Sequence, residues 1–170
     1  MMKFLLSLTF LLAIIGFQSC LHTNEIFIVR HAEKAAEPAN DPILTAEGRA
    51  RAETLKDYFK DKNIKALFST QKQRTLATAT PLSRSKDLQI QYYGNDTLKN
   101  FLQHVIGLKK NAVIVGHSNT TVVMLGHINL PHTIKYIPED DYDNLFIIKV
   151  KNGKATNIIE TTYGAASPKK

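Results

Sequence analysis

The chain has 170 residues, a formal net charge of +7 and 44% hydrophobic residues, an ordinary composition for a globular protein. This length supports one domain with a sizeable core. A basic surface suits nucleic acid or an anionic membrane, but lysine and arginine form no run longer than two and the aromatic residues do not alternate with them. We therefore expect no nucleic-acid partner, and a pocket for a small anion explains the charge equally well.

The first twenty residues predict an export signal. A charged start at Lys3 and an apolar run over residues 4–17 are typical of a secretory signal, and the run is too short for a comfortable membrane span. Cys20, the single cysteine, follows directly, which favours a lipoprotein cleavage site over a plain signal peptide. We expect removal of residues 1–19 and lipidation of Cys20, so that the protein is exported to the periplasm or cell envelope and anchored in a membrane.

Strands and helices are expected to alternate after a short tether. Short apolar runs bounded by polar residues predict strands at residues 25–30, 66–68, 88–93 and 112–115. Apolar residues at helical spacing and helix-start signals predict helices at residues 45–60, 71–82, 96–108 and 118–126. Thr45 is expected to cap the first helix, and Pro81 to kink or end the second.

The C-terminal third is expected to differ from this alternation. Residues 131–144 are rich in Pro, Asp and Tyr and predict a loop. Strands at 145–151 and 155–162 flank the turn Asn152-Gly153. Together the elements predict an α/β fold, a three-layer sandwich whose mostly parallel sheet has helices on both faces and an antiparallel edge. This single domain would span residues 20–163, and residues 164–170 would be a disordered tail.

Charged and polar side chains follow two of the expected strands. Arg30 and His31 come after the first strand, His117 and Ser118 come after the strand at 112–115, and Arg74 lies in a helix between them. In open α/β sheets, ligands bind just beyond the carboxyl ends of the strands. Because guanidinium repels cations and no carboxylate or thiolate lies at ligand spacing, these residues predict no metal site.

The same residues suit a phosphate group. Arginines bind phosphate oxygens bidentately and stay charged. A neutral imidazole beside them can attack phosphorus, and a second imidazole can donate a hydrogen bond to the transferring group. The backbone N–H of Ser118, at the start of a helix, would add a further contact to the anion.

Four stretches, in this order, resemble the histidine phosphatase superfamily, also called the phosphoglycerate mutase-like family. They cover roughly residues 25–126 and are Arg30-His31-Ala32-Glu33, Leu44-Thr45-Ala46-Glu47-Gly48, Ser69-Thr70 with Gln73-Arg74-Thr75 and Ala77-Thr78-Ala79, and Gly116-His117-Ser118-Asn119-Thr120. The resemblance implies His31 as the nucleophile, Arg30, Arg74 and His117 as the phosphate pocket, and neither a metal nor another cofactor. The chain is similar to the small members of the family, so we expect a phosphatase that hydrolyses small-molecule phosphomonoesters.

One element of the family pattern is missing. Many members carry a proton-donating acid, either directly after the second histidine, where this chain has Ser118, or after a strand between Arg74 and that histidine. Asp96 is the only carboxylate that follows a strand in this stretch, so it is either the donor or the cap of the helix that starts there. The acids of the loop 131–144 either border the pocket mouth or are solvated.

The missing glutamate leaves alternatives open. A protein of this fold that only binds phosphorylated ligands is one, because binding needs the phosphate pocket but no proton donor. A phosphomutase is the other, although export and the lack of substrate-sized insertions argue against it.

Overall fold

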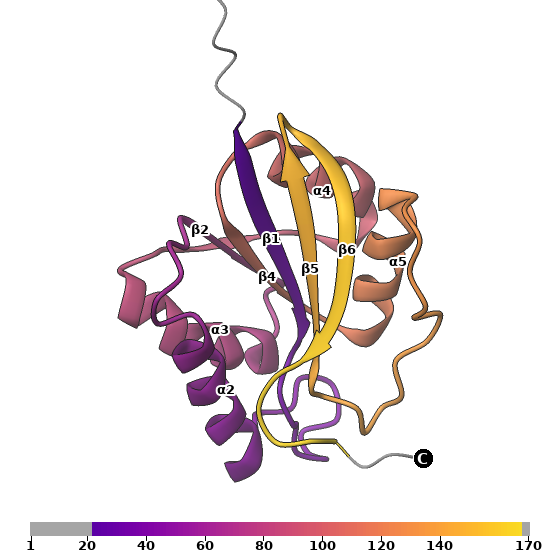
Figure 1. Cartoon of the computed structure of the whole chain (residues 1–170). Helices are drawn as coiled ribbons and strands as arrows, with labels where there is room; N and C mark the ends of the chain where they lie inside the picture. The colour runs from indigo at the N-terminus through magenta and orange to yellow at the C-terminus, as the bar shows by residue number, and fades with distance from the viewer. Residues whose placement is uncertain (1–21, 168–170) are drawn as a thin grey trace, which may run out of the picture.

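A six-stranded sheet in the order β3-β2-β4-β1-β5-β6 forms the centre of the molecule (Figure 1). The computed structural model describes residues 22–167. The strands are β1 Thr23–Arg30, β2 Ala66–Ser69, β3 Ile90–Tyr92, β4 Ala112–Gly116, β5 Asn144–Lys151 and β6 Lys154–Thr162. The first four run parallel, and β5 and β6 add an antiparallel edge. The predicted mostly parallel sheet with an antiparallel edge is confirmed.

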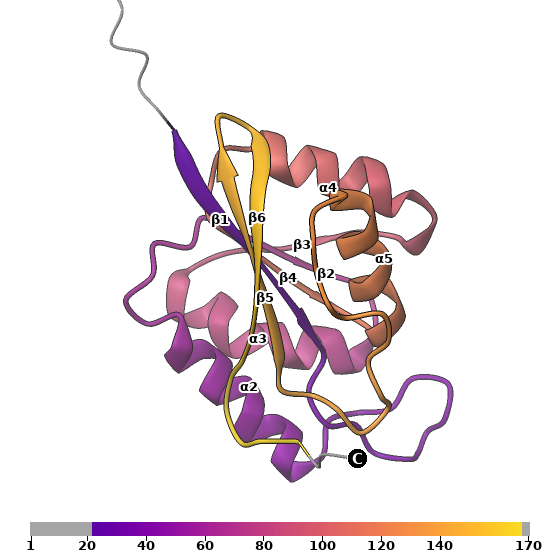
Figure 2. The ribbon, with the colours of Figure 1, turned by 45° about the vertical axis from the view of Figure 1, so that its right-hand side comes forward.

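Helices cover both faces of this sheet (Figures 1 and 2). In the described part of the chain they are α2 Ala46–Tyr58, α3 Gln73–Lys86, α4 Leu98–Gly107 and α5 Ser118–Ile128, with a short 3₁₀ turn, η2 Asn95–Thr97, before α4. Helices α2 and α3 lie on one face, and α4 and α5 on the other. The predicted three-layer α/β sandwich is therefore confirmed.

Strand β1 supplies side chains to two separate cores, one on each face. Successive side chains of a strand point to opposite faces. Ile26 and Ile28 accordingly pack in the core beneath α4 and α5, whereas Phe27 and Val29 pack in the core beneath α2 and α3. All four are fully buried, which explains why the run is apolar without alternation.

The start of α2 is fixed by its cap and by a glycine. The Thr45 hydroxyl accepts a hydrogen bond from the Gly48 N–H at 3.1 Å, as predicted for an N-cap. A Cβ atom on Gly48 would lie 2.1 Å from the Glu33 carbonyl oxygen. Only glycine therefore allows α2 to approach the segment that follows β1.

Helix α3 runs on to Lys86, past the predicted end at residue 82, so Pro81 lies inside the helix and does not end it. Proline removes one helical hydrogen bond and clashes with the preceding turn. Leu82, directly after the proline, is fully buried in the core beneath α2 and α3. The burial of side chains on both sides of Pro81 compensates for the lost bond, and this packing was not visible in the local sequence.

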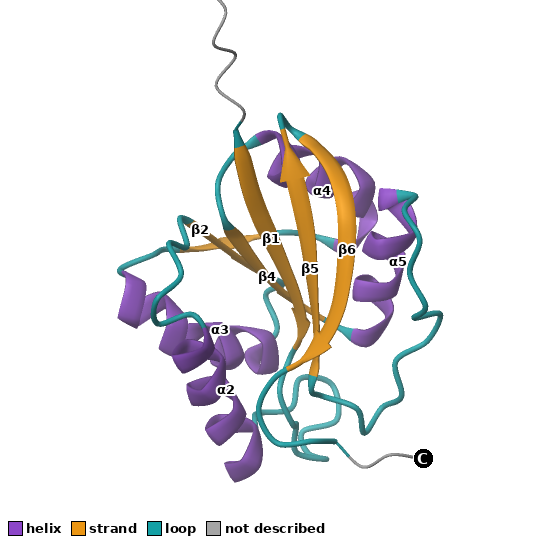
Figure 3. Ribbon diagram, viewed as in Figure 1, coloured by secondary structure: helices purple, strands orange, loops and turns teal. Residues whose placement is uncertain are grey.

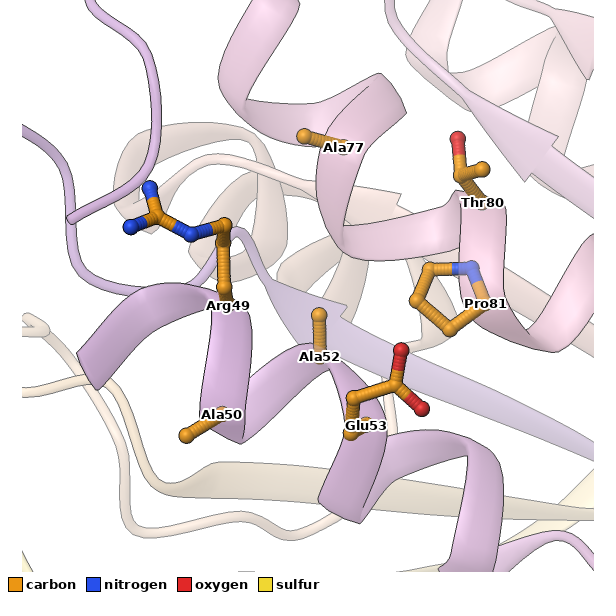
Figure 4. Close-up of a pocket in the computed structure, with 7 residues that line it drawn as sticks. All are labelled: Arg49, Ala50, Ala52, Glu53, Ala77, Thr80 and Pro81. Carbon is orange, nitrogen blue, oxygen red and sulfur yellow. The ribbon is translucent and has the colours of Figure 1, made fainter. Parts of the chain in front are cut away.

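A groove of about 450 Å³ separates parts of α2 and α3 (Figure 4). Its lining residues are Arg49, Ala50, Ala52, Glu53, Ala77, Thr80 and Pro81. Ala52 of α2 and Ala77 of α3 pack in one small apolar cluster, and none of the predicted site residues lines this groove.

The expected tail is ordered where the structure describes it. The Arg51 guanidinium donates to the Ala165 carbonyl at 2.9 Å, and the Ser167 N–H donates to the Asp143 carboxylate at 2.7 Å. These contacts hold residues 165 and 167 of the predicted tail against the domain.

Several predictions concern residues outside the described range. The signal peptide at 1–19, the lipidation site Cys20 and residues 168–170 all lie there. Within residues 22–167, no helix is both long and apolar enough to span a bilayer.

Candidate active site

Parallel pairing of β1 and β4 brings the two predicted histidines together. Arg30 is paired with Gly116 in the sheet register, and the next residues are His31 and His117. The His31 N–H donates to the Gly116 carbonyl at 2.9 Å, and the two imidazole centroids lie 5.5 Å apart. Loops gather at this end of the sheet (Figure 3), as expected for a ligand site at the carboxyl ends of parallel strands.

His31 is a neutral imidazole, and its hydrogen bond shows which ring nitrogen carries the proton. Its Nδ1 lies 2.8 Å from the Ala32 carbonyl, which only accepts, so Nδ1 carries the proton and Nε2 carries the lone pair. Burial, together with the positive charges of Arg30 and Arg74, lowers the pKa of His31 to about 3, against the opposing effect of the hydrogen bond to Ala32. At neutral pH the Nε2 lone pair is therefore available for nucleophilic attack.

Arg30 is buried beneath the loop that connects α5 to β5. Its Nη1 donates to the carbonyl groups of Pro138 at 2.6 Å and Asp141 at 2.9 Å. Its guanidinium carbon lies 4.4 Å from the centre of the Tyr142 ring, and its Nη2 lies 3.2 Å from a Glu139 carboxylate oxygen. The loop thus fixes the orientation of a guanidinium that β1 places beside His31.

Arg74 and His117 contact each other across the site. The Arg74 Nη2 lies 3.4 Å from Nδ1 of His117, and Nε2 of His117 lies 2.9 Å from the Thr70 hydroxyl. Burial, followed by the charges of Arg74 and Arg30, lowers the pKa of His117 to about 4. Because arginine only donates, neutral His117 accepts at Nδ1 and donates from Nε2 to Thr70.

Both arginines keep one buried N–H without a partner. Within residues 22–167, neither Nε of Arg30 nor Nε of Arg74 has a hydrogen-bond partner. A buried donor without an acceptor is costly, and native structures keep few of them. Two such donors on guanidinium groups that flank His31 and His117 point to an anionic acceptor, and a phosphate group satisfies both.

Ser118 opens α5 beside this cluster, with His117 as the residue before the helix. The first N–H groups of a helix have no partner within the helix, and they favour anions. The Ser118 hydroxyl lies 3.4 Å from the second oxygen of Glu139. The structure therefore brings five of the predicted site residues together: Arg30, His31, Arg74, His117 and Ser118.

Asp96 is not brought into this cluster. It is exposed in η2, after the edge strand β3, and two strands, β2 and β4, separate β3 from β1. No hydrogen bond or ion pair in the described part of the chain joins its carboxylate to the cluster. The residue that precedes α4 is Thr97, and no side-chain bond caps that helix. A catalytic role of Asp96 stays a prediction.

Two carboxylates that the motifs did not single out contact the arginines instead. Glu139 pairs with Arg30 as described, and a carboxylate oxygen of Asp41 lies 3.5 Å from Nη1 of Arg74. Asp41 belongs to the loop after β1 and Glu139 to the loop before β5. The acids of the latter loop were expected either at the pocket mouth or in solvent, and Glu139 does both, since its side chain is 71% exposed.

The segment after His31 is fixed by α2 and α3. The Ala32 N–H donates to the Thr78 hydroxyl at 2.9 Å. Glu33 accepts two hydrogen bonds from the Arg51 guanidinium, at 2.9 Å from Nε and 2.7 Å from Nη2. The Glu33 carboxylate is therefore directed to Arg51, and its pairing fixes the backbone beside His31. Among residues 22–167, no group of three or more His, Cys, Asp or Glu side chains is arranged to hold a metal ion.

Comparison with known proteins finds one matching family model. Residues 26–99 match the model of the histidine phosphatase superfamily, branch 1, a range that contains Arg30, His31 and Arg74. No curated protein sequence matches the chain.

Solved structures share the fold at low sequence identity. The protein histidine phosphatase SixA complexed with tungstate superposes with a TM-score of 0.68 at 14% identity, over 81% of this chain and 96% of that chain. The mycobacterial glucosyl-3-phosphoglycerate phosphatase superposes with a TM-score of 0.66 at 9% identity, over 85% of this chain and 100% of that chain. A putative alpha-ribazole-5'-P phosphatase from Escherichia coli superposes with a TM-score of 0.61 at 13% identity, over 83% of this chain and 99% of that chain. With the family match over residues 26–99, they confirm the predicted resemblance to the histidine phosphatase superfamily and the fold that it implies.

Proposed function

We propose that the protein hydrolyses phosphomonoesters in two steps, through a phosphohistidine on His31. The observation that carries this proposal is the state of His31, whose Nδ1 proton is bound by the Ala32 carbonyl and whose lowered pKa leaves Nε2 unprotonated. A buried neutral imidazole between two arginines suits nucleophilic attack on phosphorus better than it suits a structural role.

In the first step, the Nε2 lone pair of His31 forms a bond to phosphorus and the bond from phosphorus to the ester oxygen breaks. Arg30, Arg74 and the first N–H groups of α5 bind the phosphoryl oxygens, where negative charge is concentrated. A phosphate dianion beside His117 raises the pKa of that imidazole. The protonated Nδ1 then donates a further hydrogen bond to the phosphoryl group.

In the second step, water attacks phosphorus, the phosphorus–nitrogen bond breaks and its electron pair returns to Nε2. The ester oxygen needs a proton in the first step, and the attacking water loses one in the second. One carboxyl group can donate the first proton and accept the second. Glu139 is better placed for this than Asp96, because its two oxygens contact Arg30 and Ser118.

Trapping the intermediate tests the proposal. Purified protein is mixed with a radiolabelled phosphomonoester, denatured with base and then assayed for acid-labile phosphate on the chain. We expect labelled wild-type protein, no label and no turnover for His31→Ala, and full label for the control His104→Ala on the exposed part of α4. Turnover by folded His31→Ala would contradict the assignment of the nucleophile.

The same experiment separates the two alternatives. A protein that only binds phosphorylated ligands forms no acid-labile adduct at all. A phosphomutase forms one, but it requires a bisphosphate primer and returns the phosphoryl group to an alcohol instead of releasing inorganic phosphate.

A further inference from the structure

A groove of about 400 Å³ lies next to the proposed phosphate site, between α5 and the loop that follows it. That loop runs beside α5 (Figure 2). The lining residues are Ser118, Asn119, Val122, Val123, Lys135, Tyr136, Ile137 and Glu139. Since Glu139 lines the groove, pairs with Arg30 and contacts Ser118, the groove adjoins the proposed phosphate site. When the phosphate of an ester lies between Arg30 and Arg74, the organic part of the ester can extend towards this groove.

The helix side of the groove changes from polar to apolar over one turn. Residues four apart lie on the same helix face. Ser118 and Asn119, at the phosphate end, are therefore followed by Val122 and Val123, about 5.4 Å further along the axis. A ligand with an anionic head and an apolar body that starts within one or two bonds of it matches this gradient.

The loop side of the groove carries two apolar side chains, Tyr136 and Ile137, between the charged Lys135 and Glu139. Ile137 is buried, and Tyr136 is 69% exposed while Val123, opposite on the helix, is 45% exposed. Large apolar side chains that stay exposed around a concave surface are typical of ligand sites. Sugar hydroxyl groups placed against Val122, Val123 and Ile137 would lose hydrogen bonds to water without replacement.

We propose that this groove binds the leaving group of the substrate and selects phosphomonoesters whose alcohol carries an aromatic or similarly flat apolar group on the carbon that is bound to the ester oxygen. The inference rests on the proposed function for the position of the phosphate. The aromatic body packs between the two valines of α5 and Tyr136, and the ester oxygen lies at the polar end near Glu139.

A comparison of two substrates with the same kind of leaving oxygen tests the groove apart from the chemistry. Benzyl phosphate and a pentose phosphate esterified on its primary carbon both leave as primary alkoxides. We expect kcat/KM to be at least about tenfold higher for benzyl phosphate, the selectivity that a small apolar pocket provides. Val123→Asp and Tyr136→Ser should each remove this preference, and equal or reversed preference in the wild type would overturn the inference.

A matched control lies in the edge strand β6. Ile159 in β6 is an exposed aliphatic residue, 37% exposed, that does not line the groove. Ile159→Asp should keep the wild-type preference. Loss of the preference in this variant as well would mean that the groove does not cause it.

A binding measurement decides the inference independently of turnover. Calorimetry of the protein with benzylphosphonate and with hydroxymethylphosphonate should give a Kd at least about tenfold lower for the benzyl compound. Equal affinities overturn the groove assignment even if the protein is an active phosphatase. Preferential binding of benzylphosphonate without hydrolysis of any ester supports the groove and overturns the proposed function.

Discussion

Glu139→Gln tests which carboxyl group handles the proton during hydrolysis. The change removes the acid but keeps the shape and a hydrogen-bond donor near Arg30. A general acid contributes about a hundredfold to ten-thousandfold to rate, or about 2.7 to 5.4 kcal/mol of barrier at 1.36 kcal/mol per factor of ten. We therefore expect kcat for alkyl phosphates to fall by at least about a hundredfold, and the release of nitrophenol from its phosphate ester to be largely unaffected.

The same substitution should strengthen the binding of inorganic phosphate. The Glu139 carboxylate competes with phosphate for Nη2 of Arg30, at 3.2 Å. Since Glu139 is mostly exposed, its ion pair contributes at most about 1 kcal/mol. Removal of this competitor lowers the inhibition constant of phosphate by up to about fivefold and leaves Tm nearly unchanged. Weaker phosphate binding would mean that Glu139 orients Arg30 instead of competing for it.

Steady-state kinetics with an alkyl and an aryl ester measures both effects. Asp96→Asn is the matched control, because it makes the same carboxylate-to-amide change at the position that the sequence suggested. If Asp96→Asn alone slows alkyl esters selectively, Asp96 is the donor and the assignment of Glu139 is wrong. If neither variant discriminates between the esters, the proton comes from water or from the substrate.

Three further predictions concern stability and location. Arg51→Ala leaves the carboxylate of Glu33 without its partner and should lower the free energy of unfolding by about 3 kcal/mol. This is the low end for a broken buried pair, because the Glu33 side chain is 23% exposed. An unchanged thermal melt would refute this. The pKa values of His31 and His117 lie at about 3 and about 4, below the ordinary value of 6.5. Between these values the unfolded chain binds more protons than the folded chain. The free energy of unfolding should therefore fall as pH drops from 6.5 towards 4, by up to about 1.4 kcal/mol per pH unit for each histidine. Urea unfolding at several pH values should show this slope halved in His31→Gln, and a flat profile would contradict it. We propose that Cys20 carries a lipid anchor, so Cys20→Ser should move the exported protein from the membrane fraction to the soluble one, and a soluble wild type would exclude the anchor.

Local sequence was enough for the elements around the phosphate site. The apolar run 26–29 is buried on both sides, so it could only be a central strand, and the residues that follow it lie at its carboxyl end. Thr45 was predicted as a helix cap from its own position and the glutamate of the next turn. The extent of α3 was not predictable in this way, because the proline penalty at Pro81 is local whereas the burial of Leu82 depends on the opposite layer.

The sequence alone was thus enough to predict which residues lie together in the proposed phosphate site. Arg30, His31 and His117 follow strands whose parallel pairing is implied by the alternation of strands and helices. Only the tertiary structure decided which acid approaches them and where the organic part of a substrate can lie. Glu139 reaches Arg30 across 109 positions in the chain, through a loop with no regular pattern, and Asp41 reaches Arg74 from another loop. Contacts of this kind depend on how loops fold over a finished sheet, which leaves no periodic signal in the sequence.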